Sequence, residues 1–288
     1  MNWKAYHKPK SVAEALVLLD QAEGKGRIIA GGTDLVLQLS QGEPTAEFLV
    51  DLTEIDELKV IHEHDGWMHI GAAVTHSEAA KNALIRKEAT ALAEGCAKVG
   101  SPQIRNVATL AGNVITARPA GDGAISLLAL EAQIKVVSKT GEHWIPIEET
   151  YRGVGRSSID STREVATELR FRILGGRRRT KFFRMSRRKA LTLPILNGAV
   201  AILWGSPANR IQKARIALGP VAEKPFRARK AEAYLESAEI APESILEAAR
   251  IASEEAKPRT SLLRGTDLYR KEMIRLYLVR ALRELLIK

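Results

Sequence analysis

Two adjacent glycines directly after a short apolar run restrict the fold of this chain more than any other stretch. Arg27-Ile28-Ile29 leads into Ala30-Gly31-Gly32-Thr33-Asp34. Paired glycines let the backbone turn sharply and leave N–H groups pointing to one side, which is a turn that can hold an anion. The alternative is a tight connection between a strand and a helix, with Asp34 as the helix cap. These residues alone favour neither interpretation.

The totals of the chain allow several kinds of partner. Its 288 residues, of which 45% are hydrophobic, suit two or three modest domains with real cores. A net charge of +10 permits nucleic acid, acidic surfaces or phosphate-bearing ligands. Cys96 is the single cysteine, so any iron–sulfur cluster must sit on a partner. With no signal-like start and no run of roughly 18 apolar residues, the expected location is the cytoplasm and no membrane span is expected.

The first half of the chain predicts two units. Ser11-Val12-Ala13-Glu14 is a capping box that opens a helix to about residue 22. With strands over 27–30 and 47–52 and a short helix through 39, it forms a βαβ-like unit ending near residue 58. Asp65-Gly66 then predicts a hairpin that begins a different kind of sheet. Further helices are predicted from 75, over 87–98 and over 124–132, and further strands over 133–138, 143–147 and 165–173.

A change of composition at Gly175-Gly176-Arg177 predicts the start of a third unit. Beyond it we expect a small antiparallel sheet of three strands over 181–186, 198–204 and 213–218, and then three helices over 228–237, 242–256 and 267–286. The predicted units are therefore 1–58, 59–176 and 177–288. The last helix has apolar residues on one side, which favours packing in a bundle over a membrane surface.

A second loop shares the character of the first. Thr109-Leu110-Ala111-Gly112-Asn113 combines a hydroxyl, a glycine-bearing turn and an amide. The chain lacks both common phosphate loops, G-x-x-x-x-G-K-[ST] and a helix-opening G-x-G-x-x-G. Two loops of backbone N–H groups could instead hold a diphosphate between them, since each bond to a charged acceptor is worth about 1.5–3 kcal/mol. The alternative is an irregular surface loop.

Together the two loops resemble the FAD-binding (medium) subunit of the molybdenum hydroxylases, the xanthine dehydrogenase and carbon monoxide dehydrogenase family. Supporting matches run in the same order through the whole chain: Tyr6-His7-Lys8-Pro9, Arg187-Arg188-Lys189-Ala190, Arg215-Ile216-Ala217-Leu218-Gly219-Pro220 and Leu263-Arg264-Gly265-Thr266. The resemblance implies an α+β fold of the vanillyl-alcohol oxidase or p-cresol methylhydroxylase type. FAD would lie between two subdomains, with a C-terminal domain beside them.

The resemblance also implies site residues. In the family, two segments wrap the FAD pyrophosphate, and they match Arg27, Ile28, Ile29, Ala30, Gly31, Gly32, Thr33 and Asp34, and Thr109, Leu110, Ala111, Gly112 and Asn113. Asp122 matches the family's acidic contact toward the adenosine end of FAD. Arg184 stands where relatives often have a lysine that reaches the flavin, and Ile104 is a candidate for packing near the isoalloxazine. We name no catalytic acid or base.

Two positions depart from the family pattern. The second motif usually has paired glycines, where this chain has Ala111-Gly112. Alanine would be strained at positive φ, so we expect negative φ at Ala111. Arg184 keeps the positive charge of a lysine but presents a planar fork, which changes the contacts it can make.

Two other kinds of site are weaker interpretations. The stretch 177–189 mixes Phe182 and Phe183 with cations and could suit single-stranded nucleic acid. Its alternation is better explained by a strand with one apolar face, so we expect no nucleic acid partner. His62, His64 and His69 on the hairpin suggest a metal, but no cysteine or clear carboxylate set completes the ligands. We expect surface histidines and no metal site, and a buried, apolar role for Cys96.

The expected function is electron transfer within a larger enzyme. By resemblance, a large subunit holds the molybdenum cofactor, a small subunit holds two 2Fe–2S clusters, and FAD on this chain passes electrons to NAD or another acceptor. The chain would be one part of a hetero-oligomer. The alternatives are a free-standing FAD-dependent oxidoreductase and, from another class, a basic nucleic-acid-binding protein.

Overall fold

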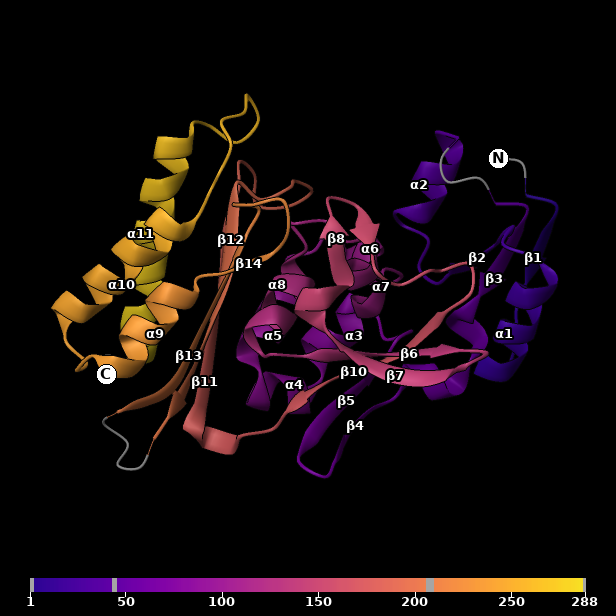
Figure 1. The fold of residues 1–288 in the computed structure, drawn as a ribbon, viewed down its shortest axis with the longest axis horizontal. Coiled ribbons are helices and arrows are strands. Elements are labelled where there is room, and N and C mark those ends of the chain that lie inside the picture. Colours follow the sequence, from indigo (N-terminus) through magenta and orange to yellow (C-terminus); the bar gives the residue numbers. More distant parts are fainter. Residues whose placement is uncertain (1–2, 43–45, 206–209, 287–288) are drawn as a thin grey trace.

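Three larger sheets follow one another along the long axis of the molecule (Figure 1). This computed structural model describes residues 3–42, 46–205 and 210–286. Helices cover the sheets, so the predicted α+β class is confirmed. Each sheet lies within one of the three predicted units. The boundaries at residues 58 and 176 themselves stay predictions.

The N-terminal unit is a small parallel sheet in the strand order β1-β3-β2. Its elements are β1 (Ala5–His7), α1 (Val12–Gln21), β2 (Gly26–Ile29), α2 (Leu35–Ser40) and β3 (Phe48–Asp51). Ser11 caps α1 by accepting the N–H of Glu14 at 3.1 Å. The predicted capping box is only half formed, because the Glu14 carboxylate accepts the N–H of Lys10 instead. Ala15 and Leu19 of α1 are buried against β3 and the next unit.

The middle unit is built on a five-stranded sheet in the order β4-β5-β10-β6-β7, with all neighbours antiparallel. The strands are β4 (Ile61–His64), β5 (Trp67–Gly71), β6 (Gln133–Ser138), β7 (Gly141–Pro146) and β10 (Val165–Arg172). Asp65 (φ 49°) and Gly66 (φ 73°) both adopt left-handed backbone, as a tight hairpin requires. The predicted hairpin is confirmed, although its first strand begins at Ile61 because Asp56–Lys59 forms a 3₁₀ turn.

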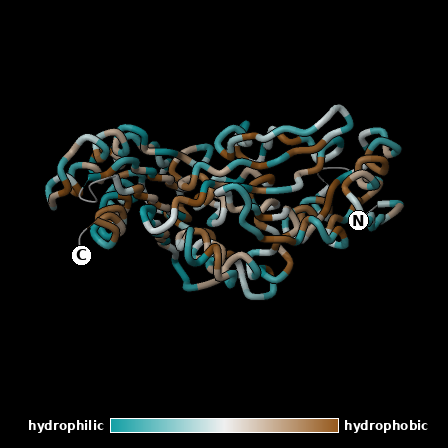
Figure 2. Tube along the Cα trace, turned by 90° about the horizontal axis from the view of Figure 1, so that it is seen from below, coloured by the Kyte–Doolittle hydropathy of each residue, from teal (hydrophilic) through white to brown (hydrophobic). Residues whose placement is uncertain are grey.

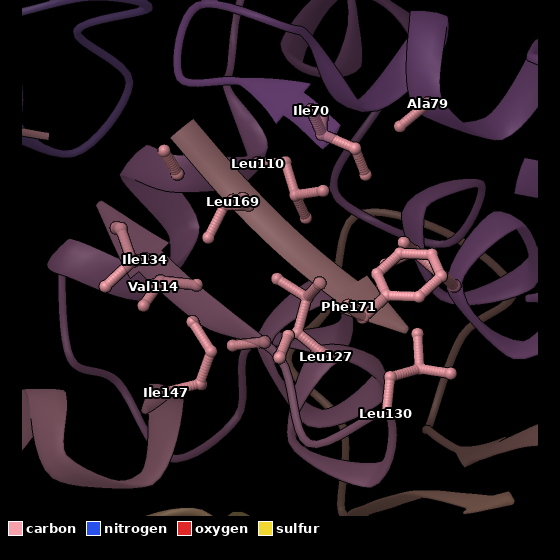
Figure 3. Close-up of a cluster of buried hydrophobic side chains, with 14 of the residues drawn as sticks. Ile70, Ala79, Leu110, Val114, Leu127, Leu130, Ile134, Ile147, Leu169 and Phe171 are labelled. Atoms are coloured by element: carbon pink, nitrogen blue, oxygen red, sulfur yellow. The ribbon is translucent and has the colours of Figure 1, made fainter. Parts of the chain in front are cut away.

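Six short helices cover one face of this sheet. They are α3 (His76–Lys81), α4 (Ala83–Glu88), α5 (Thr90–Cys96), α6 (Pro102–Arg105), α7 (Leu110–Ile115) and α8 (Asp122–Ala129). Side chains from α7, α8 and the sheet interlock in the core of the unit (Figure 3). The predicted helix over 87–98 is divided at Ala89, which adopts a non-helical conformation between α4 and α5. Cys96 is fully buried as expected, and burial raises the pKa of its thiol.

A short pair of strands, β8 (Tyr151–Gly153) and β9 (Arg156–Ser157), precedes β10. The C-terminal unit follows the 3₁₀ turn Gly175–Arg177. Its elements are β11 (Arg178–Met185), β12 (Leu196–Trp204), β13 (Ile211–Gly219), β14 (Phe226–Arg227), α9 (Arg229–Ser237), α10 (Pro242–Glu255) and α11 (Asp267–Leu286). All three predicted helices are present. The sheet has a fourth strand, β14, which is too short to carry a pattern in the sequence.

Strand β11 is buried on both faces, which corrects the expectation of one apolar face. Phe183 packs with the layer formed by α9, α10 and α11, whereas Phe182 packs with α5 and α8 of the middle unit. The sheet lies between these two groups of helices in Figure 1. Both phenylalanines are therefore withdrawn from solvent and are closed to a stacking ligand.

In the described ranges, no helix is both long and apolar enough to cross a membrane. Hydrophobic and hydrophilic stretches alternate along the described part of the chain in Figure 2. In the last helix, α11, hydrophobic positions that pack into the core alternate with hydrophilic ones. Its apolar residues, among them Ile274, Leu278 and Leu282, are fully buried in the C-terminal core, as predicted.

Candidate functional site

The first glycine loop follows the end of β2 and requires glycine at two positions. Gly32 adopts φ +66°, a left-handed conformation that costs other residues energy. Gly31 lies so close to another segment that an added Cβ would meet the carbonyl oxygen of Val107 at 2.0 Å. The N–H groups of Gly31, Gly32 and Thr33 form no hydrogen bond with any described residue. This loop therefore presents free donors beside a neighbouring loop.

The second loop is the stretch from Val107 to Asn113, which opens α7. Thr109 is the N-cap of α7, and its Oγ1 accepts the N–H of Gly112 at 3.0 Å. Ala111 lies within the helix, so the expectation of negative φ at this position is confirmed. Alanine replaces the family's first glycine here without strain. The contact of Gly31 with Val107 places this loop directly against the first one.

The two loops line one cavity of about 590 Å³, within the range typical of small-molecule and cofactor sites. The predicted residues in its wall are Arg27, Ile28, Ile29, Ala30, Gly31, Gly32, Thr33, Asp34, Ile104, Thr109, Ala111, Gly112 and Asn113. Two segments that are far apart in the sequence thus line the same cavity. Backbone N–H groups and small side chains leave room for a phosphate to approach the chain closely.

A third wall comes from residues that the sequence analysis missed. The cavity is also lined by the end of β9 and the segment that follows it toward β10, namely Ser157, Ser158, Ile159, Asp160 and Ser161. The loop is held in place by the N–H of Ile28, which donates to the carbonyl oxygen of Ser161 at 3.0 Å. No glycine pair or periodic pattern distinguishes these residues, so the sequence offered no signal for them.

His76 is a second residue that the sequence analysis missed. It follows the capping residue of α3, is fully buried and lines the cavity. Neither Nδ1 nor Nε2 has a hydrogen-bond partner in the described part of the chain. Burial, with a smaller effect from Arg105, lowers the pKa of His76 to about 4. A neutral imidazole with free nitrogens in a cavity wall is available to a bound ligand, because an unpartnered buried polar group costs free energy.

The pKa of His76 leads to a testable acid dependence of stability. The folded protein holds His76 neutral down to about pH 4, whereas the unfolded chain protonates near its ordinary pKa of 6.5. Holding His76 neutral therefore adds no penalty to the free energy of unfolding above about pH 6.5. As the pH falls below this value the folded state loses stability, and the loss amounts to roughly 2 kcal/mol by about pH 5. Between about pH 7.5 and about pH 5, urea unfolding should show the wild type losing roughly 2 kcal/mol more of its free energy of unfolding than His76→Gln loses.

The comparison between the two proteins isolates His76 from other titrating groups. Burial raises the pKa of Asp122 to about 6, so Asp122 changes stability in the opposite direction over the same range. Asp122 is present in both proteins, and its contribution cancels in the difference. Equal pH dependence of the wild type and His76→Gln would contradict the assignment of a neutral, buried imidazole.

Three residues implied by the resemblance do not line the cavity. Leu110 is buried in the core of the middle unit (Figure 3). Asp122 and Arg184 form a buried ion pair with each other, with Nε to Oδ2 at 3.1 Å. Asn197 donates to the Asp122 carboxylate at 2.6 Å. This pair joins α8 to the C-terminal sheet, and contacts of either residue with FAD stay predictions.

The sequence left open whether Asp34 caps a helix or belongs to a turn that holds an anion. It occupies the N-cap position of α2, but its side chain makes no capping hydrogen bond. It lines the cavity and is exposed to solvent. Arg27 also lines the cavity, and desolvation lowers the pKa of its guanidinium while Asp160 acts against this. The cavity wall therefore carries charges of both signs beside the two glycine loops.

The described chain contains one group of three side chains that could hold a metal ion, namely His62, His69 and Glu168. It lies on the five-stranded sheet and does not line the glycine-loop cavity. The expectation of solvated surface histidines is wrong for His69, whose Nδ1 contacts Glu168 Oε1 at 2.7 Å. Glu168 carries no signal beside the histidines in the sequence, because it comes from β10, 99 residues away from His69.

Comparisons with known proteins agree with this architecture. A structure titled carbon monoxide dehydrogenase from Hydrogenophaga pseudoflava superposes with a TM-score of 0.90 at 26% identity, covering 98% of this chain and 96% of that one. The nicotinate dehydrogenase FAD-subunit of Eubacterium barkeri is 28% identical, covering 93% of this chain and 91% of that protein. The xanthine dehydrogenase FAD-binding subunit of Escherichia coli O157:H7 is 26% identical, covering 90% and 88%.

Two family models together account for nearly the whole chain. Residues 1–171 match the FAD binding domain in molybdopterin dehydrogenase. Residues 181–285 match the CO dehydrogenase flavoprotein C-terminal domain. The first match contains both glycine loops and every wall of the cavity described above. The chain therefore belongs to the FAD-binding flavoprotein subunits of the molybdenum hydroxylase family.

Proposed function

We propose that this chain is the electron-transfer subunit of a molybdenum hydroxylase complex. It would take electrons from the 2Fe–2S clusters of a small partner subunit and pass them through FAD to NAD or another acceptor. The molybdenum cofactor and the primary substrate would be on a large subunit. The single cysteine supports this division, because a cluster of this kind is held by several cysteine ligands and Cys96 is buried in a core.

The observation that carries the proposal is the meeting of the two glycine loops at one cavity. The free N–H groups of Gly31, Gly32 and Thr33 suit the oxygens of a pyrophosphate. The second loop contributes Thr109, Ala111, Gly112 and Asn113 to the same cavity, and Gly31 allows the two backbones to touch. These residues fit FAD, and we assign the pyrophosphate to the space between the loops.

FAD, when bound, supplies the redox chemistry, and the chain supplies position and electrostatics. The loops hold the cofactor by its phosphates. His76 offers a neutral imidazole to the cofactor and adds no positive charge to the cavity at neutral pH. Ile104 adds an apolar side chain to the same wall, which suits the packing role that the family resemblance implies.

An exposed apolar surface on the C-terminal unit supports the proposal that this chain binds partner subunits. The leucine surface of the C-terminal unit is formed by Leu191, Leu193, Leu262 and Leu263 on two loops and by Leu268 in the first turn of α11, each more than half exposed. Arg187 joins the loops by donating to the carbonyl oxygen of Leu262 at 2.8 Å. Exposed apolar patches of this kind mark protein interaction sites. We assign the leucine surface to a neighbouring subunit of the complex.

The test is purification of the chain as the cell makes it, through a cleavable tag. We expect a yellow protein with stoichiometric FAD that brings iron–sulfur and molybdenum subunits with it. Changing Leu262 and Leu263 to lysine should release these partners while FAD stays bound. A colourless chain that takes up no FAD on reconstitution would refute the proposal. A yellow chain that purifies alone and oxidises an organic substrate would favour a free-standing oxidoreductase.

A further inference from the structure

We propose that the outer face of the five-stranded sheet carries a divalent metal site, formed by His62, His69 and Glu168, that binds Zn²⁺. The three residues come from the adjacent strands β4, β5 and β10. One ligand atom from each lies within 4.8 Å of the others. Two imidazoles and a carboxylate form a ligand set that zinc commonly takes in proteins, with the remaining position open to water.

The strand register brings these residues together. His62 and His69 are directly opposite each other in the antiparallel ladder of β4 and β5. Their rings stack with centroids 5.0 Å apart. Glu168 lies on the next strand, where β10 pairs with β5, and its Oε1 accepts the Nδ1–H of His69 at 2.7 Å. A rigid sheet therefore holds all three side chains on one face.

The distances require little movement for an ion to bind. Zinc bonds to nitrogen and oxygen are about 2.0–2.2 Å long, so tetrahedral ligand atoms lie roughly 3.3 Å apart. The His69–Glu168 contact of 2.7 Å needs to open by about 0.6 Å to reach this spacing, with the zinc ion taking the place of the proton between the two atoms and the proton leaving to solvent. His62 is exposed on the edge strand, so its ring is free to turn toward the ion.

The neighbouring charges decide which ion fits. Arg170 lies on the same strand and face as Glu168, and its guanidinium is stacked between Trp67 (4.4 Å) and Trp144 (3.7 Å). Gln133 accepts the Nε–H of Arg170 at 2.8 Å, which holds it in this place. This cation opposes binding of a second one, so the affinity depends on soft imidazole nitrogens more than on charge. That balance favours Zn²⁺ over Mg²⁺ or Ca²⁺.

The proposed role is to fasten the edge of the sheet. Strand β4 pairs only with β5 in the described structure, and an ion held by β4, β5 and β10 would join all three. Binding to the folded state alone stabilises that state by mass action. Zinc should therefore raise the thermal unfolding midpoint of the protein, independently of FAD and of any partner subunit.

The test is a Zn²⁺ titration of the untagged full chain against a chromophoric chelator, with the thermal midpoint as a second readout. His62→Ala should abolish competition with the chelator and the zinc-dependent rise in midpoint. Glu168→Gln should weaken binding by at least about 10-fold, because it replaces an anionic ligand of the ion with a neutral amide. His64→Ala is the matched control, because His64 is the next residue on the same face of β4 and is outside the ligand set.

Retained FAD in each variant shows that the chain is folded. The proposal is overturned if the wild type does not compete with the chelator. It is also overturned if His62→Ala binds zinc as well as the wild type, or if His64→Ala loses binding to the same extent. None of these outcomes bears on the cofactor, since the cluster does not line the glycine-loop cavity.

Discussion

Gly31→Ala is expected to remove most of the affinity of the chain for FAD. The new Cβ would lie 2.0 Å from the carbonyl oxygen of Val107 and 2.6 Å from its carbon. Both are backbone atoms, so one loop must move away from the other. The loss of two hydrogen bonds to phosphate would cost about 3–6 kcal/mol, or roughly a 10²- to 10⁴-fold increase in the dissociation constant. Fluorescence titration of the apoprotein with FAD measures this change.

A matched control separates the loop geometry from the loss of a glycine as such. Gly176 has no atom within 4 Å of an added Cβ and has no positive φ. Gly176→Ala should therefore leave FAD binding unchanged. Gly32→Ala should weaken binding for a different reason, because φ +66° strains an alanine. Wild-type affinity in Gly31→Ala would show that the two loops do not need to touch in order to hold the cofactor.

Arg184→Met is expected to lower the free energy of unfolding by about 3–5 kcal/mol, the usual cost of removing one partner of a buried ion pair. The side chains of Arg184 and Asp122 are only 8% and 5% exposed. Without Arg184, Asp122 keeps only the amide of Asn197 as a side-chain hydrogen-bond partner among the described residues. Urea unfolding at about pH 7.5 measures the loss.

Two further measurements decide what Arg184 does. The loss should shrink as the pH falls toward about 6, the pKa of Asp122 in the wild type, and level off below it, because removing the cation raises the pKa of Asp122 further and the carboxyl of the variant is protonated first. The double variant Arg184→Met with Asp122→Asn should recover most of the stability, since no charge is left buried. If Arg184→Met is as stable as the wild type and loses only FAD affinity, Arg184 is a cofactor contact and not a partner of Asp122.

The local elements were predictable because their signals are local. The capping residues Ser11 and Thr75, the Asp65-Gly66 turn and the apolar spacing of the last helix each act within a few residues of themselves. Errors occurred where local pattern and tertiary packing disagree. Ala89 interrupts a helical pattern, and β11 is buried on both faces although its sequence alternates.

The candidate site was predictable in part. The two glycine loops could be recognised in the sequence because close backbone approach and positive φ restrict the choice of residue, as at Gly31 and Gly32. The serine-rich wall from Ser157 to Ser161 and the imidazole of His76 have no such signature. Their role depends on which chain segment lies opposite, and that is decided by packing across the whole domain.

By itself, the sequence determined the order of the elements, the two glycine loops and the lack of cysteines for a cluster. Only the tertiary structure decided which distant groups meet. It joined Gly31 to Val107, paired Asp122 with Arg184 across 62 residues, and set His69 beside Glu168 across 99. The physical reason is that turns and helices are encoded by neighbours in the chain. Contacts between sheets and loops are selected by burial and register over the whole fold, and no short stretch of sequence contains both partners.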